Sequence, residues 1–313
     1  MNYLSAGILV IASAVAAWVA PIWTYAISLA LFGLPHVLVE LRYVDERFAA
    51  RIPRNLVMGL VICLSGIVLM RTFAVVEIGS SDERITGELL FGICLIATAL
   101  PMLRRSRMSP IAIAAAASLL LGILYAPITT LVTMALLHNL TPVGFLAERL
   151  QDGERPRAML LCLIVFVLIP LVILMAPASM LMMEGPLSVG HLDDHLSSFV
   201  PPGLLGTSIA DRLFAAAAYL QCMHYAVVLH VLPKLAGGDQ AKHATLPWPK
   251  QRVFLTAVGC LGIIMTIGFV ANFREARSTY SMFAAMHAWI EIPVLMIAFA
   301  VLPKVFFREE RLT

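Results

Sequence analysis

The segment RAMLLCLIVFVLIPLVILMAP, residues 157–177, sets the fold class of this chain. After Arg157 it has no charged side chain, and it is long enough to cross the bilayer core, which takes about 20 apolar residues in a helix. The whole chain has the same character: 60% of its 313 residues are hydrophobic, 13% are charged, and the mean hydropathy is +0.90. Soluble domains are usually about 25% charged, so lipid must be the solvent for most of this chain.

Nine other stretches have the same character. The predicted spans are residues 3–20, 22–41, 56–76, 87–103, 109–125, 127–147, 157–177, 207–232, 253–272 and 280–303. The sequence therefore predicts an all-α, polytopic helix bundle of about ten transmembrane helices, organised as one transmembrane domain over residues 1–313. Because only Pro21 separates the first two spans, residues 3–41 could also cross once. No basic residue precedes the first span, so we expect a retained helix and not a signal peptide.

The Lys and Arg residues predict the orientation, because basic residues are enriched in cytoplasmic loops. With both termini inside, all but five of the 22 Lys and Arg residues are cytoplasmic. The five outer ones are Arg71, Arg84, Arg212, Arg274 and Arg277. We expect the N- and C-termini inside, with the protein in a bacterial-type inner (plasma) membrane. The net charge of only +3 gives no case for nucleic-acid binding.

Residues 178–206 form the longest segment between predicted spans, and we expect an outer-side loop, a lid or an interfacial segment there. The segment has no Lys or Arg, and it contains His191, Asp194 and His195. Such a cluster is typical of a polar surface. The alternatives are a second metal site or a substrate entrance.

Ionisable side chains inside spans are costly and are concentrated at functional sites. Four predicted spans carry a histidine, and two of these also carry a glutamate four residues later, on the same helix face. The residues are His36, Glu40, His138, His224, His287 and Glu291. Imidazole and carboxylate together suit iron or a similar divalent metal, so we predict these six as metal ligands.

Alternative interpretations apply to single members of this set. One intramembrane histidine is often only an interhelical hydrogen-bonding group, and Glu40 could belong to an interfacial charge network with Arg42 and Arg47. Depth is a further test. His36 and two other histidines lie about 8–15 Å from the predicted cytoplasmic ends of their spans, whereas His287 is deeper and would need helix tilt to meet them.

Four polar residues are predicted to support these ligands from behind. Gln221 shares a helix face with His224, and Thr141 shares one with His138. Tyr225 and Asn139 are the immediate neighbours of the same two histidines.

Dioxygen dissolves in lipid, as would a polyene, a sterol or an acyl chain. The sequence therefore predicts a membrane-embedded non-haem iron oxygenase, with membrane lipid, dioxygen and a lipophilic small molecule as its partners. Catalytic residues other than the ligands are not identified.

Two short stretches carry a resemblance to a known family. Residues Gly33-Leu34-Pro35-His36 resemble the Gly-x-Pro-His segment of the bacterial β-carotene-cleaving dioxygenases of the Brp/Blh family, and Gln221-x-x-His224-Tyr225 resembles His-Tyr segments of that family. The resemblance implies a multi-helix membrane dioxygenase with histidine-bound iron, in which His36 and His224 are ligands. The chain departs from the family pattern where Val37 replaces a glycine and Glu40 is the nearest acid, so the substrate is not implied.

Two other classes of protein also fit the pattern. Histidines on facing helices can hold haem, although haem ligation does not require the neighbouring carboxylates. An ion-coupled transporter could use the same His and Glu residues to relay protons, and such carriers commonly contain inverted repeats. No convincing repeat is present in this sequence.

Overall fold

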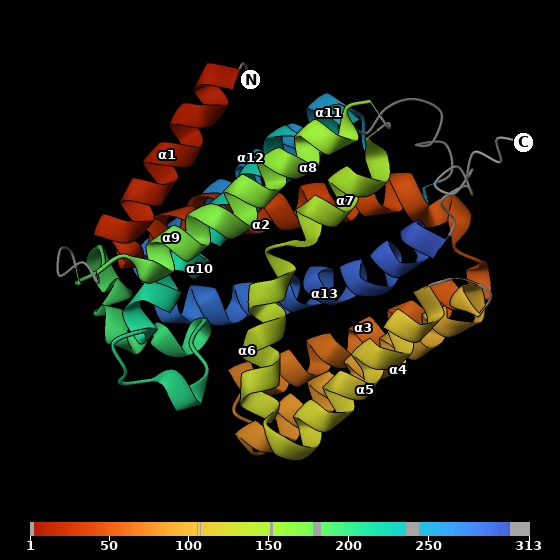
Figure 1. Cartoon of the computed structure of the whole chain (residues 1–313). Coiled ribbons are helices and arrows are strands. Elements are labelled where there is room, and N and C mark those ends of the chain that lie inside the picture. Colours follow the sequence, from red (N-terminus) through yellow and green to blue (C-terminus); the bar gives the residue numbers. More distant parts are fainter. Residues whose placement is uncertain are drawn as a thin grey trace, which may run out of the picture.

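The computed structural model of the chain describes residues 3–104, 106, 108–150, 153–177, 183–235 and 244–300. In these residues, regular structure is helical apart from one isolated bridge between Glu184 and His191, and the helices pack side by side as a bundle (Figure 1). The main helices are α1 (Tyr3–Val19), α2 (Pro21–Phe48), α3 (Arg54–Val75), α4 (Ser81–Leu103), α5 (Met108–Tyr125), α6 (Pro127–His138), α7 (Thr141–Arg149), α8 (Arg155–Leu163), α9 (Ile169–Met175), α10 (Ala210–His230), α11 (Leu232–Leu235), α12 (Gln251–Ala271) and α13 (Phe273–Ala300).

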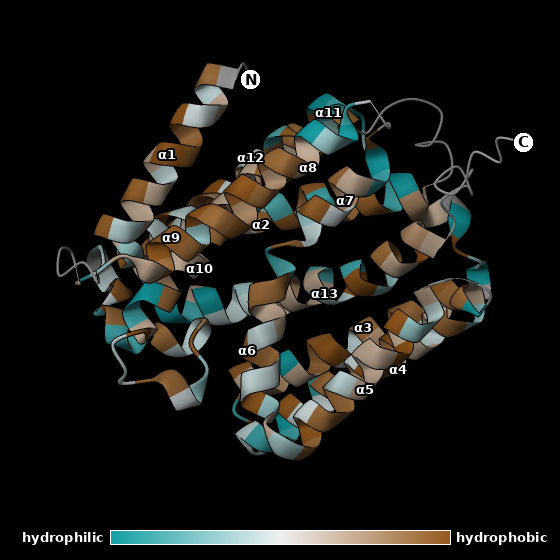
Figure 2. Ribbon diagram, viewed as in Figure 1, coloured by the Kyte–Doolittle hydropathy of each residue, from teal (hydrophilic) through white to brown (hydrophobic). Residues whose placement is uncertain are grey.

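The outer surface of the bundle is apolar. Within the described residues, nine helical segments are long and apolar enough to cross a membrane, and α1 is a shorter apolar helix. Figure 2 shows hydrophobic residues along most of the helices, including α1, α8 and α9. Large side chains such as Met175 and Tyr125 are 80% and 81% exposed. Soluble monomers rarely expose apolar patches of this extent. The predicted polytopic bundle of about ten spans is therefore confirmed, and the protein is a multi-pass integral membrane protein.

One helix, α13, connects the two halves of the bundle. Helices α3, α4 and α5 pack together on one side, while α10 and α12 pack on α2 on the other (Figure 1). Helix α13 lies between them and contacts α2, α3 and α4. The two helices whose sequences carry a His-x-x-x-Glu pair, α2 and α13, therefore pack against each other inside the bundle.

Helix α2 is longer than the predicted span over residues 22–41, because it continues to Phe48. Its last two turns carry charged side chains, and these are paired with other groups of the protein. Arg42 pairs with Glu46 one turn on at 2.7 Å, and Arg47 reaches the buried carboxylate of Glu148 on α7 at 2.9 Å. Asp45 accepts hydrogen bonds from the backbone of residues 245–246 and from Trp248. These tertiary contacts stabilise a helical end that hydropathy alone assigns to a loop.

Two predicted spans are interrupted. The span over residues 127–147 breaks after His138, where Asn139 and Leu140 separate α6 from α7, so its second half starts a new helix. The span over residues 157–177 contains a π-helical turn, Ile164–Leu168, between α8 and α9. Pro170 follows this turn and lacks the N–H that a regular helix would use, which is a usual cause of such irregularities. The end of the last predicted span, residues 301–303, lies outside the described residues.

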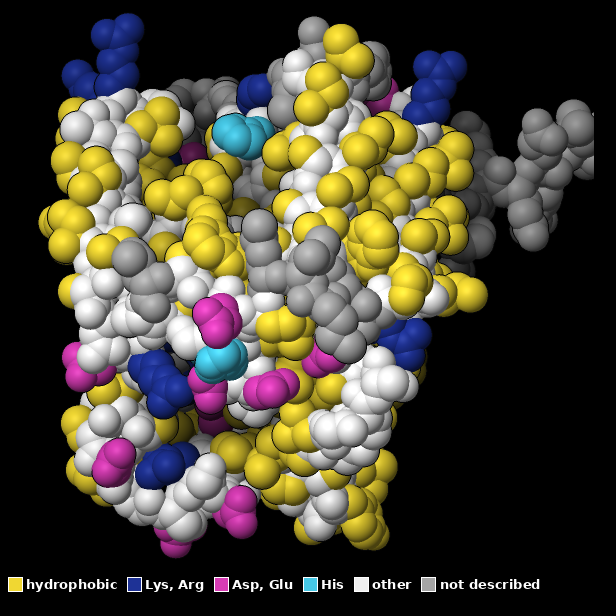
Figure 3. Space-filling view, turned by 90° about the vertical axis from the view of Figure 1, so that its left-hand side faces the viewer, with side chains coloured by type: hydrophobic (Ala, Val, Ile, Leu, Met, Phe, Trp, Pro, Cys, Tyr) yellow, Lys and Arg dark blue, Asp and Glu magenta, His cyan; other side chains and the backbone are white. Residues whose placement is uncertain are grey.

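The two ends of the bundle differ in charge. One end carries the basic residues of α2, α7 and the start of α12. The other end is covered by residues 183–206, which form four short turns, Leu187–Val189, Leu192–Asp194, Leu196–Ser198 and Pro202–Leu204, over the ends of α2, α10 and α13. Figure 3 shows acidic and basic side chains gathered around a histidine on this end. We refer to residues 183–206 as the outer loop. Residues 178–182, which the sequence assigns to the same segment, lie outside the described residues.

Candidate metal centre

Four helices bring four histidines to one point inside the bundle. His36 lies on α2, His138 ends α6, His224 lies on α10 and His287 lies on α13. One nitrogen from each ring lies within 4.8 Å of the others. His36, His224 and His287 are at most 1% exposed. The arrangement is compatible with several rings binding one metal ion after small side-chain adjustments.

The rings of His36 and His287 face each other in an unusual way. The Nδ1 of His36 lies 3.1 Å from the carbonyl oxygen of Phe32, and that of His287 lies 3.3 Å from the carbonyl oxygen of Phe283. A carbonyl can only accept, so each Nδ1 carries the proton and donates. In the neutral rings both Nε2 atoms are then lone-pair acceptors, yet they are only 3.2 Å apart. Two facing lone pairs repel each other unless a proton or a metal cation lies between them.

The two glutamates pair with histidines of other helices. Glu291 Oε2 lies 2.8 Å from Nδ1 of His138, and Glu40 Oε2 lies 3.3 Å from Nε2 of His224. Glu40, Glu291 and His287 also present ligand atoms within 4.8 Å of one another. Two buried carboxylates at this separation destabilise each other unless they share a proton or a cation.

Several polar atoms of the cluster have no hydrogen-bond partner among the described residues. They are both carboxylate oxygens of Glu40, Oε1 of Glu291 and both ring nitrogens of His224. The 3.3 Å approach of Glu40 to His224 is close enough for an ion pair but does not have hydrogen-bond geometry. Leaving buried polar groups unpaired costs about 1–3 kcal/mol each. A cation at the centre of the cluster would satisfy carboxylate oxygens of Glu40 and Glu291 and one of the two ring nitrogens of His224, so the residues fit a metal ion.

The depth mismatch expected for His287 is absent. Because α2 continues to Phe48, His36 lies near the middle of that helix and not near its end. His287 is likewise near the middle of α13. The structure therefore brings all six predicted ligands together, although each glutamate approaches a histidine of a different helix more closely than the sequence spacing indicates.

The four predicted supporting residues have different surroundings. The ring of Tyr225 stacks on His36, with centroids 4.0 Å apart. The hydroxyl of Thr141 donates to the backbone carbonyl of His138, and Asn139 donates to the carbonyl of Ala135. Gln221 contacts no histidine ring through its amide but donates to Ser28 on α2 at 2.8 Å. Thr141 and Asn139 therefore hold the backbone around His138, and Gln221 joins α10 to α2, the helices that carry His224 and His36.

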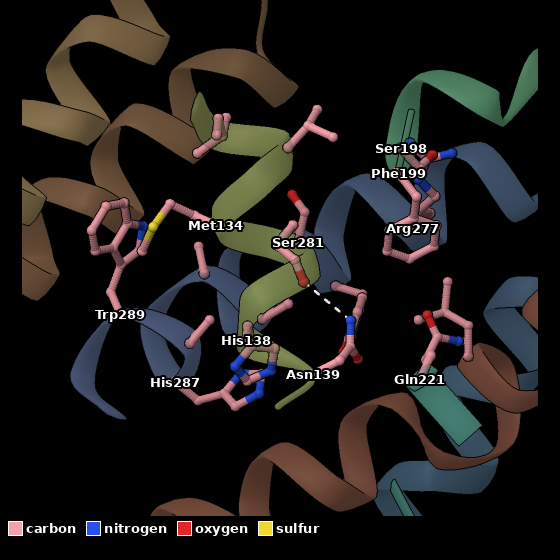
Figure 4. Close-up of a pocket in the computed structure, with 18 of the residues that line it drawn as sticks. Met134, His138, Asn139, Ser198, Phe199, Gln221, Arg277, Ser281, His287 and Trp289 are labelled. Carbon is pink, nitrogen blue, oxygen red and sulfur yellow. Dashed lines mark hydrogen bonds between the residues drawn. The ribbon is translucent and has the colours of Figure 1, made fainter. Parts of the chain in front are cut away.

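A cavity of about 330 Å³ adjoins the cluster (Figure 4). His36, His138 and His287 line one end of it, and Ser198 and Arg277 line the other. The volume lies at the lower end of the range typical of small-molecule sites, about 300–1,000 Å³. The cavity therefore extends from the histidines toward residues of the outer loop, and its volume next to the histidines could hold a small molecule.

A buried ion pair next to this cavity was not anticipated from the sequence. Arg71 on α3 contacts both carboxylate oxygens of Glu88 on α4, at 2.7 and 2.8 Å. The indole of Trp289, between two predicted ligands on α13, donates to the same carboxylate at 3.1 Å. One feature of the sequence indicates this ion pair: two consecutive apolar spans carry opposite charges near the same end of the bundle.

The polar cluster of residues 191–195 does not form a ligand set among the described residues. The side chain of His191 is 66% exposed and lies 3.9 Å from Glu184. His195 points inward and uses both ring nitrogens: Nε2 donates to the carbonyl of Val189, and Nδ1 accepts from Arg277. His195 therefore has no lone pair left for a metal.

Comparison with known proteins gives no assignment: no protein-family model, no curated protein and no solved structure matches this chain. The function has to be inferred from the chemistry of the cluster and the cavity.

Proposed function

We propose that the protein is a membrane-embedded, metal-dependent oxidoreductase, and specifically a non-haem iron oxygenase that acts on a lipid-soluble substrate. The proposal keeps the scaffold and the metal chemistry that the resemblance to the Brp/Blh dioxygenases implies, and it leaves the carbon skeleton of the substrate open.

One observation carries the proposal: the facing Nε2 atoms of His36 and His287, 3.2 Å apart, with each Nδ1 bonded to a backbone carbonyl. Metal-binding histidines usually donate their other ring N–H in this way, which fixes the ring and raises its basicity. A histidine that only joins two helices would instead point a donor at an acceptor. Here two acceptors converge, which supports a bound cation.

In this proposal, iron supplies the activation of dioxygen, and the chain supplies a dry, shaped site. His36, His138, His224 and His287 would hold the ion, and Glu40 and Glu291 would balance its charge. A mixture of neutral imidazoles and carboxylates is typical of non-haem iron. Tyr225 fixes the plane of His36 by stacking on it, and the cavity leaves one side of the cluster open to the substrate.

The packing of the rings favours this site over haem. A porphyrin clamped between His36 and His287 would need a wide, flat space between the rings. The His138 ring lies 4.6 Å from His287 and the His224 ring 5.2 Å from His36, centroid to centroid. Both rings occupy the volume in which the macrocycle would have to lie.

Metal analysis and an optical spectrum of the detergent-purified protein test the proposal. We expect stoichiometric iron without a Soret band. A Soret band would contradict the proposal and indicate that the histidines ligate haem. Folded protein that contains neither metal nor haem, and that has not been exposed to chelators, would contradict the proposal and favour a proton-relaying transporter, for which the buried His and Glu residues also qualify.

Substitution of His224 is the sharpest variant test. His224 is fully buried and forms no hydrogen bond in the described chain, and its one polar contact is the 3.3 Å approach of Glu40, so His224→Ala should lose most of the bound metal while the bundle still folds. His230→Ala is the matched control, since it makes the same change at the exposed end of the same helix. If His224→Ala kept the full metal content of His230→Ala, His224 would not be a ligand.

A further inference from the structure

A cation without a carboxylate partner lies at the end of the cavity away from the metal cluster. Arg277 lines the cavity and is half-buried. Its Nη1 donates to Nδ1 of His195 at 3.0 Å. An arginine has five N–H donors in a planar fork, and no acidic side chain of the described residues pairs with this one. The other cavity arginine, Arg71, is already neutralised by Glu88.

His195 acts as a positioning residue for this arginine. Its Nε2 donates to the carbonyl oxygen of Val189 at 2.7 Å, which leaves Nδ1 as the acceptor for the guanidinium. The histidine is itself 1% exposed and packed between Tyr25 and Phe273. The guanidinium is therefore held in one place by a neutral acceptor, which keeps its positive charge available.

A hydroxyl group without a partner lies at the same end. Ser198 lines the cavity, and its Oγ is buried without a hydrogen-bond partner among the described residues. Figure 4 shows Ser198 and Arg277 together at one end of the cavity, His138 and His287 at the other, and Ser281 between them. One fixed cation and one unpaired hydroxyl are donors suited to a carboxylate.

Small side chains leave the path between the two ends open. From Arg277 to His287, the residues of α13 that line the cavity are Tyr280, Ser281, Ala284 and Ala285, of which only Tyr280 is large, and Ala288 continues the row of small residues. Ten residues of helix separate Arg277 from His287, which is about 15 Å along the axis. A flexible chain lying along this row would have its head at Arg277 and a carbon deep in the bilayer at the histidines.

We propose that the cavity binds a single-chain lipid carboxylate, with the carboxylate at Arg277 and Ser198 and the acyl chain along α13 toward the histidine cluster. One cation matches one negative charge. A cavity of about 330 Å³ suits one chain better than the two of a phospholipid. The inference rests on the proposed function only for the reaction at the far end of the chain. The binding itself needs no metal.

Equilibrium binding to the purified full-length protein tests this inference, with palmitate and hexadecanol as probes that differ only in the head group. We expect palmitate to bind more tightly than hexadecanol. Arg277→Gln should weaken palmitate binding by at least about tenfold, the usual effect of losing a charged hydrogen bond, and should leave hexadecanol binding unchanged. Arg277→Lys should have an intermediate effect, because it keeps the charge but loses the planar fork.

Arg274→Gln is the matched control, because Arg274 is 70% exposed and lies 3.5 Å from Asp194 on the surface. It should leave the binding of both probes unchanged. Equal binding of palmitate to the wild type and to Arg277→Gln, or no palmitate binding to the wild type, would overturn the inference. Iron content measured on the same samples separates the two proposals, since Arg277→Gln should retain metal and His224→Ala should lose metal but still bind palmitate.

Discussion

At the scale of single residues, the tautomer of a histidine decides how it can act inside the membrane. His36 and His287 each donate Nδ1–H to the carbonyl four residues earlier in their own helix. That bond lies within one helix and needs no partner from another helix. Each ring is oriented so that a basic nitrogen faces the cluster. His195 differs, because both of its nitrogens are used within the protein.

His195 makes the stability of the outer loop depend on pH. Burial, and to a smaller extent the neighbouring Arg277 and Arg274, lower the pKa of His195; the carbonyl of Val189 and the carboxylate of Asp194 oppose the shift without reversing it. In the unfolded chain the pKa is about 6.5. As the pH falls through this value, His195 becomes protonated in the unfolded chain before it does in the folded chain. The free energy of unfolding therefore decreases as the pH falls.

Thermal unfolding in detergent between pH 7.5 and pH 5 measures this effect. We expect the midpoint temperature of the wild type to fall with pH, and to fall less in His195→Gln, whose amide oxygen can still accept from Arg277. His191→Gln is the control, because His191 is exposed and should retain the wild-type dependence. An unchanged pH dependence in His195→Gln would exclude His195 as its source.

At the scale of helices, α12 provides no ligand but supports the helix that provides two. Pro35 interrupts the hydrogen bonding of α2 one residue before His36. Gly262 of α12 approaches this point so closely that a Cβ there would lie 2.8 Å from Cγ of Pro35. The hydroxyl of Thr266, one turn on, donates to the carbonyl of Ala30 at 2.7 Å. The carbonyl that Pro35 deprives of its helical donor is that of Leu31, the next residue along the chain, and close support by a neighbouring helix is what allows a proline within a membrane helix.

Two glycines of α12 allow a matched test of this support. Gly262→Ala should push against the rigid ring of Pro35, cost about 1–3 kcal/mol as an overpacked contact, and weaken metal binding through displacement of His36. Gly259→Ala meets nothing within 4 Å and should be neutral or stabilising by up to about 1 kcal/mol, the usual gain of alanine over glycine in a helix. Thermal unfolding and metal content are measured on both variants. Equal behaviour of the two would show that the α2–α12 contact does not position His36.

At the scale of the whole molecule, hydropathy predicts the number of spans and their approximate bounds, since apolar runs of this length have few other uses. The rarity of ionisable groups in those runs also gives a short list that contains the six residues that the bundle brings together, although Arg71 and Glu88 lie in predicted spans as well. The partners of these residues were not predictable. The pairing of Glu40 with His224 and of Glu291 with His138 depends on which helices are neighbours and how each is rotated. The contact between His195 and Arg277 likewise joins segments far apart in sequence.

The orientation of the bundle in the membrane is a separate prediction. The basic residues of α2 and α7 and the start of α12 lie at one end, and the outer loop lies at the other. The distribution of Lys and Arg predicts that the basic end is cytoplasmic. Because Arg277 lies at the opposite end, the same orientation requires a lipid carboxylate to enter the cavity from the outer leaflet.

Cysteine labelling in intact cells measures this orientation. Asp193 in the outer loop and Lys250 before α12 are both exposed. Asp193→Cys should react with a membrane-impermeant maleimide in intact cells, and Lys250→Cys should react only after lysis. The wild type provides the background, and its exposed thiols, Cys94 and Cys260, lie within membrane-spanning helices, where an impermeant reagent does not reach them. The reverse labelling pattern would show that the bundle has the opposite orientation, with the Arg277 end of the cavity at the cytoplasmic leaflet. The geometry of the metal cluster and of the Arg277 site does not depend on this orientation.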